Sequence, residues 1–375
     1  MSNLRNLGDV ATVVAGFGFS ETYQGRTTLP TPFIKVSDFA TGKDSWLSTA
    51  ANTVDRDILK ALRAKTYPAG TVVFPKVGGA LLTNKRARLA VEATFDNNVM
   101  GLIPTQIDGD YLFYFMRSFD MARIANTQSL PSVRASDVSR IEIPVPRPET
   151  QRQIATRLKA QLAEVETAWQ ASQMQLRELT KLANSIIYDS IKNVAPTPRT
   201  LGDVLDEVKK GIGQSWKKYP VLGATRGGLA PAKEQPGKQA PKYKPAFPGT
   251  VFYNPMRILI GSIAFVDDDD TPGITSPDYV ALRGKEGVVD SRWFYHWLRS
   301  PLGEQCILSL ARGAVRERML FNRLAEGAIQ LPDFAEQERA STALNELRPL
   351  RQTIEQQLRE IDLLPKKILA QAFDQ

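Results

Sequence analysis

The sequence predicts an α+β protein with a pseudo-twofold internal repeat: two tandem α/β domains separated by two long antiparallel coiled-coil helices. Two observations predict this fold class. Short segments recur in the same order in both halves of the 375 residues, and each half ends in a stretch whose apolar residues have heptad spacing. In addition, 42% of the residues are hydrophobic, which is enough to build globular cores of ordinary size.

The internal repeat rests on short motifs. Leu7-Gly8-Asp9-Val10 near the start returns as Leu201-Gly202-Asp203-Val204. Four further pairs follow at similar offsets: Gly16–Ser20 with Gly211–Ser215, Pro68–Phe74 with Ala246–Tyr253, Met116–Ser118 with Leu298–Ser300, and Ile143–Pro146 plus Gln151 with Leu331-Pro332 plus Gln337. One such match is weak evidence, but the shared order of all five indicates two copies of one unit.

The first part of each copy has the pattern of an α/β domain. Short β-rich runs cover 10–14 and 71–74 in the first copy and 250–253 and 258–266 in the second, between Gly- and Pro-rich turns. With the heptad segments they predict four parts, which are a domain at 1–147, a long helix at 148–195, a second domain at 196–333 and a second long helix at 334–375.

The tail of each copy predicts a long helix. After Pro148 the chain runs to about residue 192 without glycine or proline. The residues predicted to pair the two helices are Leu158, Leu162, Val165, Trp169, Leu176, Leu179 and Ile186 in the first tail and Leu344, Leu347, Ile354, Leu358, Ile361 and Ile368 in the second. Each rod is roughly 60 Å long, which exceeds the width of a domain of this size. Pro349 and Pro365 predict that the second helix is kinked or starts late. The alternative is that each apolar seam packs only on its own domain.

The charge of the chain makes a polyanionic partner plausible. The formal net charge is +8, and it is unevenly distributed. Between Lys209 and Arg257 there are ten lysine and arginine residues and one acid, Glu234. This block therefore predicts a surface that attracts a polyanion such as nucleic acid.

Motifs for catalysis, cofactors and metals are incomplete. Gly16-Phe17-Gly18 lacks the third glycine of a dinucleotide fingerprint, and Asn254-Pro255-Met256-Arg257 lacks the second proline and the aromatic of an amino-methyltransferase tetrad. A single cysteine, Cys306, and a single histidine, His296, exclude an intrachain disulfide and a His/Cys zinc cage; both are expected to be packing residues. Asp267–Asp270 precedes Thr-Pro-Gly, so a solvated turn is favoured over a cation site. We expect no catalytic residue and no metal ligand in this chain.

Basic residues in loops are the remaining candidates for a site. Arginine matches guanine edges and phosphate oxygens, whereas lysine mainly neutralises phosphates. The candidate DNA-binding residues are Lys76, Lys85, Arg86, Arg88 and Arg134 in the first copy and Lys217, Lys218, Arg226, Arg257, Arg312, Arg316 and Arg318 in the second. Because most single surface charges are only solvated, the clusters are a stronger prediction than any one residue.

Nearly the whole chain resembles one known family. Two similar segments close the two β-rich units, and a heptad helix follows each. They are Ile143-Pro144-Val145-Pro146-Arg147-Pro148-Glu149-Thr150-Gln151-Arg152 and Gln330-Leu331-Pro332-Asp333-Phe334-Ala335-Glu336-Gln337-Glu338-Arg339. With the two Leu-Gly-Asp-Val openings, this arrangement is similar to the specificity subunit of type I restriction-modification enzymes. The two prolines in the second helix depart from the pattern and put the straightness and partner-binding face of that helix in doubt.

The resemblance implies a function without catalysis by this chain. Each domain would be a target-recognition domain that reads one half of a split sequence in double-stranded DNA, and the helix pair would fix the unread spacer. Two methyltransferase subunits would dock mainly on the helices to modify an adenine in each half-site, and a translocating restriction subunit would join them for cleavage. This chain would hold no cofactor, and S-adenosylmethionine, ATP and Mg would be bound by the partner subunits.

Two other functions stay open from the sequence. A coiled-coil scaffold would bind protein partners and have only non-specific DNA affinity. A stand-alone methyltransferase or nuclease is disfavoured by the missing motifs. No apolar run approaches the roughly 20 residues that span a bilayer, and the first residues lack the pattern of a secretion signal. We therefore expect a cytoplasmic protein without a membrane partner.

Overall fold

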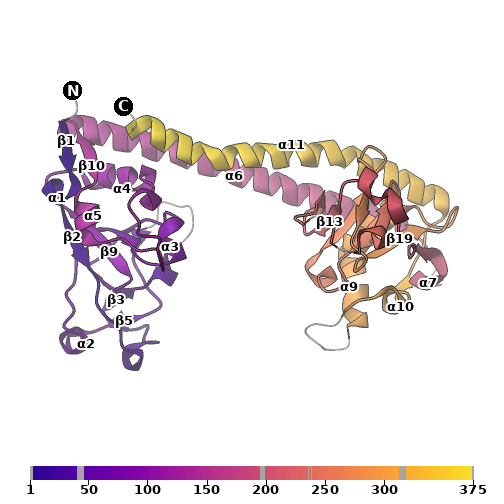
Figure 1. Cartoon of the computed structure of the whole chain (residues 1–375), viewed down its shortest axis with the longest axis horizontal. Helices are drawn as coiled ribbons and strands as arrows, with labels where there is room; N and C mark the ends of the chain where they lie inside the picture. Colours follow the sequence, from indigo (N-terminus) through magenta and orange to yellow (C-terminus); the bar gives the residue numbers. More distant parts are fainter. Residues whose placement is uncertain are drawn as a thin grey trace. The chain divides into compact units, whose positions relative to one another are not determined.

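The computed structural model describes residues 3–39, 46–194, 199–234, 236–237, 239–311 and 318–373. The chain divides into two compact units: unit 1 comprises Met1–Gln170 and Arg359–Gln375, and unit 2 comprises Ala171–Leu358. Each unit combines one globular domain with a part of both long helices, α6 (Pro148–Ile191) and α11 (Phe334–Phe373) (Figure 1). Whether the globular parts and the helices are the four separate domains expected from the sequence stays a prediction.

The two long helices run without interruption. Helix α6 has 44 residues and α11 has 40. Of the two outcomes expected from Pro349 and Pro365, the late start is wrong, because α11 begins at Phe334 and continues through both prolines. The kink stays a prediction. A helical proline removes one backbone hydrogen bond, and the burial of Leu344, Leu358 and Leu369 on the same helix offsets this cost. Among the helices that the structure describes, none has the length and apolar composition needed to cross a bilayer.

The helices pair through the predicted apolar seams, and every predicted seam residue is buried or half-buried. In unit 1, Leu158 near the start of α6 shares a core with Leu369 near the end of α11. In unit 2, Ile187 near the end of α6 shares a core with Leu344 near the start of α11. The start of each helix therefore meets the end of the other, as the antiparallel arrangement requires. The side chain of Arg351 on α11 donates a 3.0 Å hydrogen bond to Thr180 Oγ1 on α6.

The ends of the helices also pack on the globular domains. In unit 2 the indole Nε1 of Trp293, which is fully buried, donates a 3.0 Å hydrogen bond to Ser190 Oγ on α6. This contact joins the end of α6 to α8 (Ser291–Arg299) of the domain. In unit 1 the ring of Phe373 on α11 lies edge-on to Tyr111, with centroids 5.3 Å apart. The seams therefore pack both on each other and on the domains.

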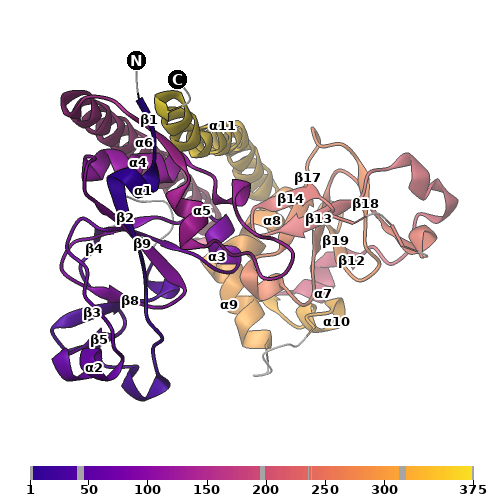
Figure 2. The same cartoon turned by 60° about the vertical axis from the view of Figure 1, so that its left-hand side comes forward.

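The domain of unit 1 contains a five-stranded sheet of order β2-β9-β6-β7-β4, a three-stranded sheet of order β5-β3-β8 and the antiparallel pair β1-β10. The strands are β1 (Asn3–Asn6), β2 (Ala11–Ala15), β3 (Thr31–Ile34), β4 (Trp46–Leu47), β5 (Thr53–Val54), β6 (Val72–Pro75), β7 (Ala87–Leu89), β8 (Thr94–Phe95), β9 (Val99–Pro104) and β10 (Glu142–Val145). The helices are α1 (Leu7–Val10), α2 (Arg56–Ala61), α3 (Gly79–Leu82), α4 (Gly109–Ser118) and α5 (Ala135–Ser139). The aromatic face of α4 packs on the five-stranded sheet, and the three-stranded sheet lies at the end of the unit remote from β1 and α6 (Figure 2).

The domain of unit 2 contains an antiparallel sheet of order β12-β19-β16-β17 and the pairs β13-β14, β15-β18 and β11-β20. The strands are β11 (Arg199–Thr200), β12 (Leu205–Glu207), β13 (Leu222–Thr225), β14 (Gly228–Pro231), β15 (Lys244–Ala246), β16 (Thr250–Tyr253), β17 (Ile263–Val266), β18 (Gly273–Thr275), β19 (Val280–Gly284) and β20 (Ala328–Ile329). The helices are α7 (Leu201–Val204), α8 (Ser291–Arg299), α9 (Pro301–Leu310) and α10 (Phe321–Leu324). Helix α8 packs on β16, β17 and β19, so its place on the sheet corresponds to that of α4 in unit 1.

The repeat extends to individual hydrogen bonds. In the first turn of α6, the buried Gln151 accepts a 2.8 Å bond from the backbone N–H of Asp108 and donates a 2.8 Å bond to a proline carbonyl just before the helix. In the first turn of α11, the buried Gln337 does the same with Asp290, at 3.0 Å, and with the corresponding proline carbonyl, at 3.0 Å. Asp108 and Asp290 are in turn the N-caps of α4 and α8. The two glutamines therefore join each long helix to the same point of each domain.

Candidate nucleic-acid interface

In unit 2 the guanidinium of Arg299, at the end of α8, joins two loops. Its Nη2 donates a 2.7 Å hydrogen bond to the carbonyl of Arg226 at the tip of the β13-β14 hairpin. Its Nη1 donates to the carbonyls of Gly261, at 3.3 Å, and Ile263, at 2.9 Å, at the end of the loop between β16 and β17. We call residues 225–228 and 254–262 the two-loop platform. Arg226 and Arg257, both predicted from the sequence as DNA contacts, are exposed on this platform.

The β16-β17 loop differs from the sequence expectation. The run 258–266 was expected to be one strand, but only Ile263–Val266 is a strand, and Ile258–Ile260 forms the 3₁₀ turn η6. The cause is Gly261, whose φ of 80° ends the turn in the left-handed region that glycine adopts without strain. The turn brings Arg226 close: its Cγ lies 3.8 Å from the position that a Cβ on Gly261 would take.

In unit 1 the structure brings two of the predicted basic segments together. The backbone N–H of Val133 donates a 3.0 Å hydrogen bond to the carbonyl of Lys76, and the N–H of Gly78 donates a 2.7 Å bond to the carbonyl of Pro131. The segment that carries Lys76 is therefore joined to the loop that carries Arg134. The side chain of Arg134 is exposed, and that of Lys76 is half-buried.

The prediction that Arg86 contacts DNA is wrong for this conformation, because its side chain is only 4% exposed. Its Nε donates a 3.0 Å hydrogen bond to the carbonyl of Met116, its Nη1 a 2.7 Å bond to the carbonyl of Lys85, and its Nη2 a 3.1 Å bond to Asn84 Oδ1. Burial lowers the pKa of Arg86 to about 9. The side chain joins α4 to the turn before β7, and its burial keeps it out of reach of a phosphate.

Arg88 needs the same correction, since it is 3% exposed. Its guanidinium lies between the rings of Trp46 and Phe113, with its carbon 4.1 Å from each centroid, and it pairs with the carboxylate of Asp110. A cation between two aromatic faces and beside a carboxylate stabilises the interior of the domain. The sequence shows the charge of such an arginine but not the direction in which its side chain points.

The other predicted basic residues occupy different places. Lys217 and Lys218 are exposed on the 3₁₀ helix η4 (Gly213–Lys218), which packs on η5 (Ala240–Lys242). Lys85 is half-buried and donates a 3.3 Å hydrogen bond to a backbone carbonyl. Arg318 is exposed and forms an ion pair with Asp278 at 3.6 Å. Arg312 and Arg316 lie outside the described residues.

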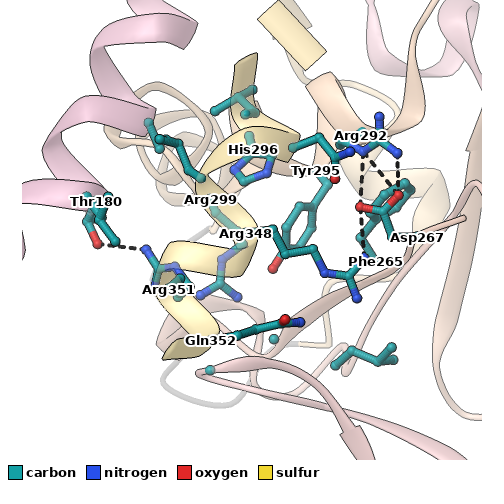
Figure 3. A pocket seen from close by; sticks show the side chains of 18 of the residues that line it. Thr180, Phe265, Asp267, Arg292, Tyr295, His296, Arg299, Arg348, Arg351 and Gln352 are labelled. Atoms are coloured by element: carbon teal, nitrogen blue, oxygen red, sulfur yellow. Dashed lines mark hydrogen bonds and ion pairs between the residues drawn. The ribbon is translucent and has the colours of Figure 1, made fainter. Parts of the chain in front are cut away.

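Unit 2 also contains a cavity of about 350 Å³ lined by α6, α8, α11 and the β13-β14 hairpin (Figure 3). At its wall, Asp267 accepts hydrogen bonds from Arg292 Nε at 3.0 and 3.2 Å and forms a 3.2 Å ion pair with Arg348 Nη1. Arg348 also pairs with Asp270. Burial alone would raise the pKa of Asp267, but the hydrogen bonds from Arg292 and the charges of both arginines lower it.

The expectation of a solvated turn at Asp267–Asp270 holds for Asp268 and Asp269, which are exposed in a turn, and is wrong for Asp267 and Asp270. Asp267 is only 7% exposed, and with Asp270 it holds arginines from α8 and α11. Within the described ranges, no group of three or more His, Cys, Asp or Glu side chains is placed to hold a metal ion. The four-aspartate segment therefore anchors α11 to the domain.

His296 borders the same cavity (Figure 3). Burial, and then the positive charges of Arg299 and Arg351, lower the pKa of this histidine to about 3. Its imidazole is therefore neutral at neutral pH and is poorly suited to proton transfer there.

Arg299, which joins the two loops of the platform, is a functional residue that the sequence analysis missed. In the sequence it is only part of a repeated motif, and no pattern indicates that it binds two loops.

The comparisons with known proteins agree with this architecture. Residues 2–171 match the family model of the type I restriction modification DNA specificity domain. A curated relative, the type I restriction enzyme MjaIX specificity subunit of Methanocaldococcus jannaschii, is 22% identical over 246 residues. That alignment covers 62% of this chain and 54% of the relative, so the match spans about half of the relative's length.

Solved structures show the same fold. A chain from a structure of a type I restriction-modification system, studied for complex assembly and conformational transition, superposes with a TM-score of 0.65 at 18% identity, covering 99% of this chain and 97% of that one. The S subunit of the type I restriction-modification system of M. genitalium superposes with a TM-score of 0.53 at 13% identity, covering 100% and 96%. The α+β fold with paired long helices is therefore confirmed, and residues 2–171 of the chain belong to the family of type I restriction modification DNA specificity domains.

Proposed function

We propose that this chain is the sequence-specific DNA-binding subunit of a type I restriction-modification complex and reads a bipartite duplex target. The domain of unit 1 contacts one half-site and the domain of unit 2 contacts the other. The observation that carries this proposal is the two-loop platform of unit 2, where Arg299 joins the loop of the exposed Arg226 to the loop of the exposed Arg257. The joined Lys76 and Arg134 segments of unit 1 support the same role there.

We propose that the long helices set the unread spacer between the half-sites. Two domains at a fixed separation multiply their selectivities, provided that the connection is stiff, whereas a flexible connection loses this gain. The support is that α6 and α11 are each continuous across the division between the units and pair through buried seams in both. A helix of 44 residues has a length of about 66 Å at 1.5 Å per residue.

We further propose that two methyltransferase subunits dock on the outer faces of the helices and that a restriction subunit joins them. In unit 2, α6 exposes Met174, Leu182 and Tyr188, which are apolar or aromatic side chains suited to a protein interface. The chemistry is assigned to these partners, which would bind S-adenosylmethionine, ATP and Mg, and this chain is not itself an enzyme. The family assignment supports this division.

The proposal is tested by methylome sequencing of cells that carry this chain with its methyltransferase partner. The expected result is one split motif with a fixed gap. The double substitution Arg226→Ala and Arg257→Ala is expected to weaken binding of the half-site read by unit 2 by about 1 to 3 kcal/mol for each arginine, because both contacts to DNA are lost. Recognition of the other half-site should not change.

Arg56→Ala, which removes an exposed arginine from α2 in unit 1, is the matched control and should leave the motif intact. Anisotropy measurements at fixed salt, with either half-site scrambled, give the same comparison in solution. A chain that bound every duplex alike, with steep salt dependence and no split motif, would be a scaffold with non-specific affinity, and the proposal would fail.

A further inference from the structure

The β16-β17 loop of the two-loop platform exposes three large apolar side chains to solvent. Met256 is 61% exposed, Leu259 46% and Ile260 64%. Single exposed apolar residues are common, but three within five residues, beside an exposed arginine, form a patch that marks an interaction site. The side chain between them, Ile258, is 3% exposed and anchors the loop in the core.

The backbone of this loop is held rigidly. The N–H of Met256 donates a 3.0 Å hydrogen bond to Asn254 Oδ1, and the N–H of Arg257 donates a 2.9 Å bond to the carbonyl of Asn254. The N–H of Ser262 closes the loop with a 3.1 Å bond to the carbonyl of Arg257, and Arg299 binds the carbonyl of Gly261. The loop therefore presents its apolar side chains from an ordered backbone, and a partner would bind them without ordering the loop first.

The charges around the apolar patch indicate which kind of partner it binds. The two-loop platform contains Arg226 and Arg257 and no aspartate or glutamate. A partner must then offer anions at the edge and an apolar surface at the centre. Duplex DNA does so, because phosphates line each groove and stacked bases lie between them. Proteins that kink DNA insert methionine, leucine or isoleucine between base pairs and place basic residues on the flanking backbone.

We propose that Met256 and Ile260 form an apolar wedge that enters between adjacent base pairs in the half-site read by unit 2, while Arg226 and Arg257 contact the flanking phosphates. The wedge separates one base step, and the distortion contributes to selectivity because steps differ in the cost of unstacking. This inference rests on the proposed function, since it requires that unit 2 binds DNA.

The test uses the full chain with its methyltransferase partner and a duplex carrying the motif recovered from the methylome. 2-Aminopurine replaces the bases of the second half-site one at a time, and its fluorescence rises where stacking is lost. We expect a rise at one step on binding. We also expect the double substitution Met256→Ala and Ile260→Ala to abolish the rise and to weaken binding of this duplex about tenfold. Leu4→Ala, which truncates a side chain that is 60% exposed on β1, is the matched control and should preserve both.

The outcomes separate the two proposals. If the double variant keeps the fluorescence rise and the affinity of the wild type, the wedge is refuted while DNA reading by unit 2 stands. If the wild type binds the target without any rise, the loop contacts base edges only, and the wedge is again refuted. If scrambling the second half-site changes neither affinity nor fluorescence, the proposed function itself fails. Circular dichroism of each variant confirms that the fold is intact.

Discussion

The side chain of Gln337 illustrates how much one residue contributes to the fold. It is fully buried, and its amide makes three hydrogen bonds to the backbone: it accepts from Asp290 and donates to the carbonyls of Val288 and Pro332, each at 3.0 Å. These bonds join the first turn of α11 to the segment that begins α8. An amide that satisfies three backbone groups in the interior leaves all three unpaired when it is removed.

We therefore expect Gln337→Ala to lower the free energy of unfolding of unit 2 by about 1 to 3 kcal/mol. Urea denaturation followed by tryptophan fluorescence measures this change, because Trp293 and Trp297 are buried in the same core. Gln161→Ala, at an exposed position of α6, is the control and should change the free energy by less than about 0.5 kcal/mol. Equal effects of the two substitutions would contradict a structural role for the buried amide.

Two arginines show that the exposure of a side chain could not be predicted from the sequence. Arg86 and Arg257 are both arginines in predicted loops, yet one is 4% exposed in the core and the other is on the surface. Their exposure differs because Arg86 donates hydrogen bonds to the carbonyl of Met116 and to the side chain of Asn84, which come from separate parts of the chain. Such contacts depend on tertiary packing, which a local sequence pattern does not predict.

At the scale of elements, helix α11 holds two prolines in its interior. Each proline lacks the N–H that would bond to the carbonyl four residues earlier, and its ring crowds that carbonyl. The helix persists because its ends are buried in both units, through Leu344 in one and Leu369 in the other. Tertiary burial therefore outweighs a local preference to break.

Replacing Pro349 with alanine should stabilise unit 2 by about 1 to 3 kcal/mol, because it restores one backbone hydrogen bond and removes the steric conflict. The position is exposed, so no buried contact is lost. Urea denaturation of the full chain gives the difference, with Gln357→Ala at another exposed position of α11 as the reference. A loss of stability in the proline variant would mean that the ring packs favourably, contrary to this account.

The elements themselves were predicted unevenly. The long helices follow from heptad spacing over many turns, and the start of α11 at Phe334 coincides with the predicted boundary. The run 258–266 was harder, because its apolar residues suit a strand while the conformation of Gly261 imposes a turn at Ile258–Ile260. Periodicity identifies long elements well, and single backbone conformations decide short ones.

For the whole molecule, the internal repeat was the most predictive feature of the sequence. The two Leu-Gly-Asp-Val motifs form α1 and α7, and in each the first N–H donates a 2.8 Å bond to a carbonyl near the end of the same domain. The candidate interface was less predictable. Arg226 and Arg257 were among the predicted residues, but the hydrogen bonds from Arg299 form only when folding brings the β13-β14 hairpin and the β16-β17 loop together.

Under the proposed function, removal of seven residues from each long helix should change the spacer of the DNA target and leave both half-sites as they are. Seven residues preserve the heptad phase, so the seams still meet while each rod is shorter by about 10 Å. Methylome sequencing of cells carrying this variant with the methyltransferase partner measures the gap. Altered half-sites with an unchanged gap would contradict a spacing role for the helices.

The three bonds from Arg299 end on main-chain carbonyls of residues 226, 261 and 263, not on side chains. Every amino acid supplies a carbonyl, so the side chain at position 226 can be exchanged without breaking the clamp. Under the proposed function, natural variation or directed evolution can therefore change the recognised DNA sequence by replacing the exposed side chains of the two-loop platform, while the bonds from Arg299 keep its backbone in place.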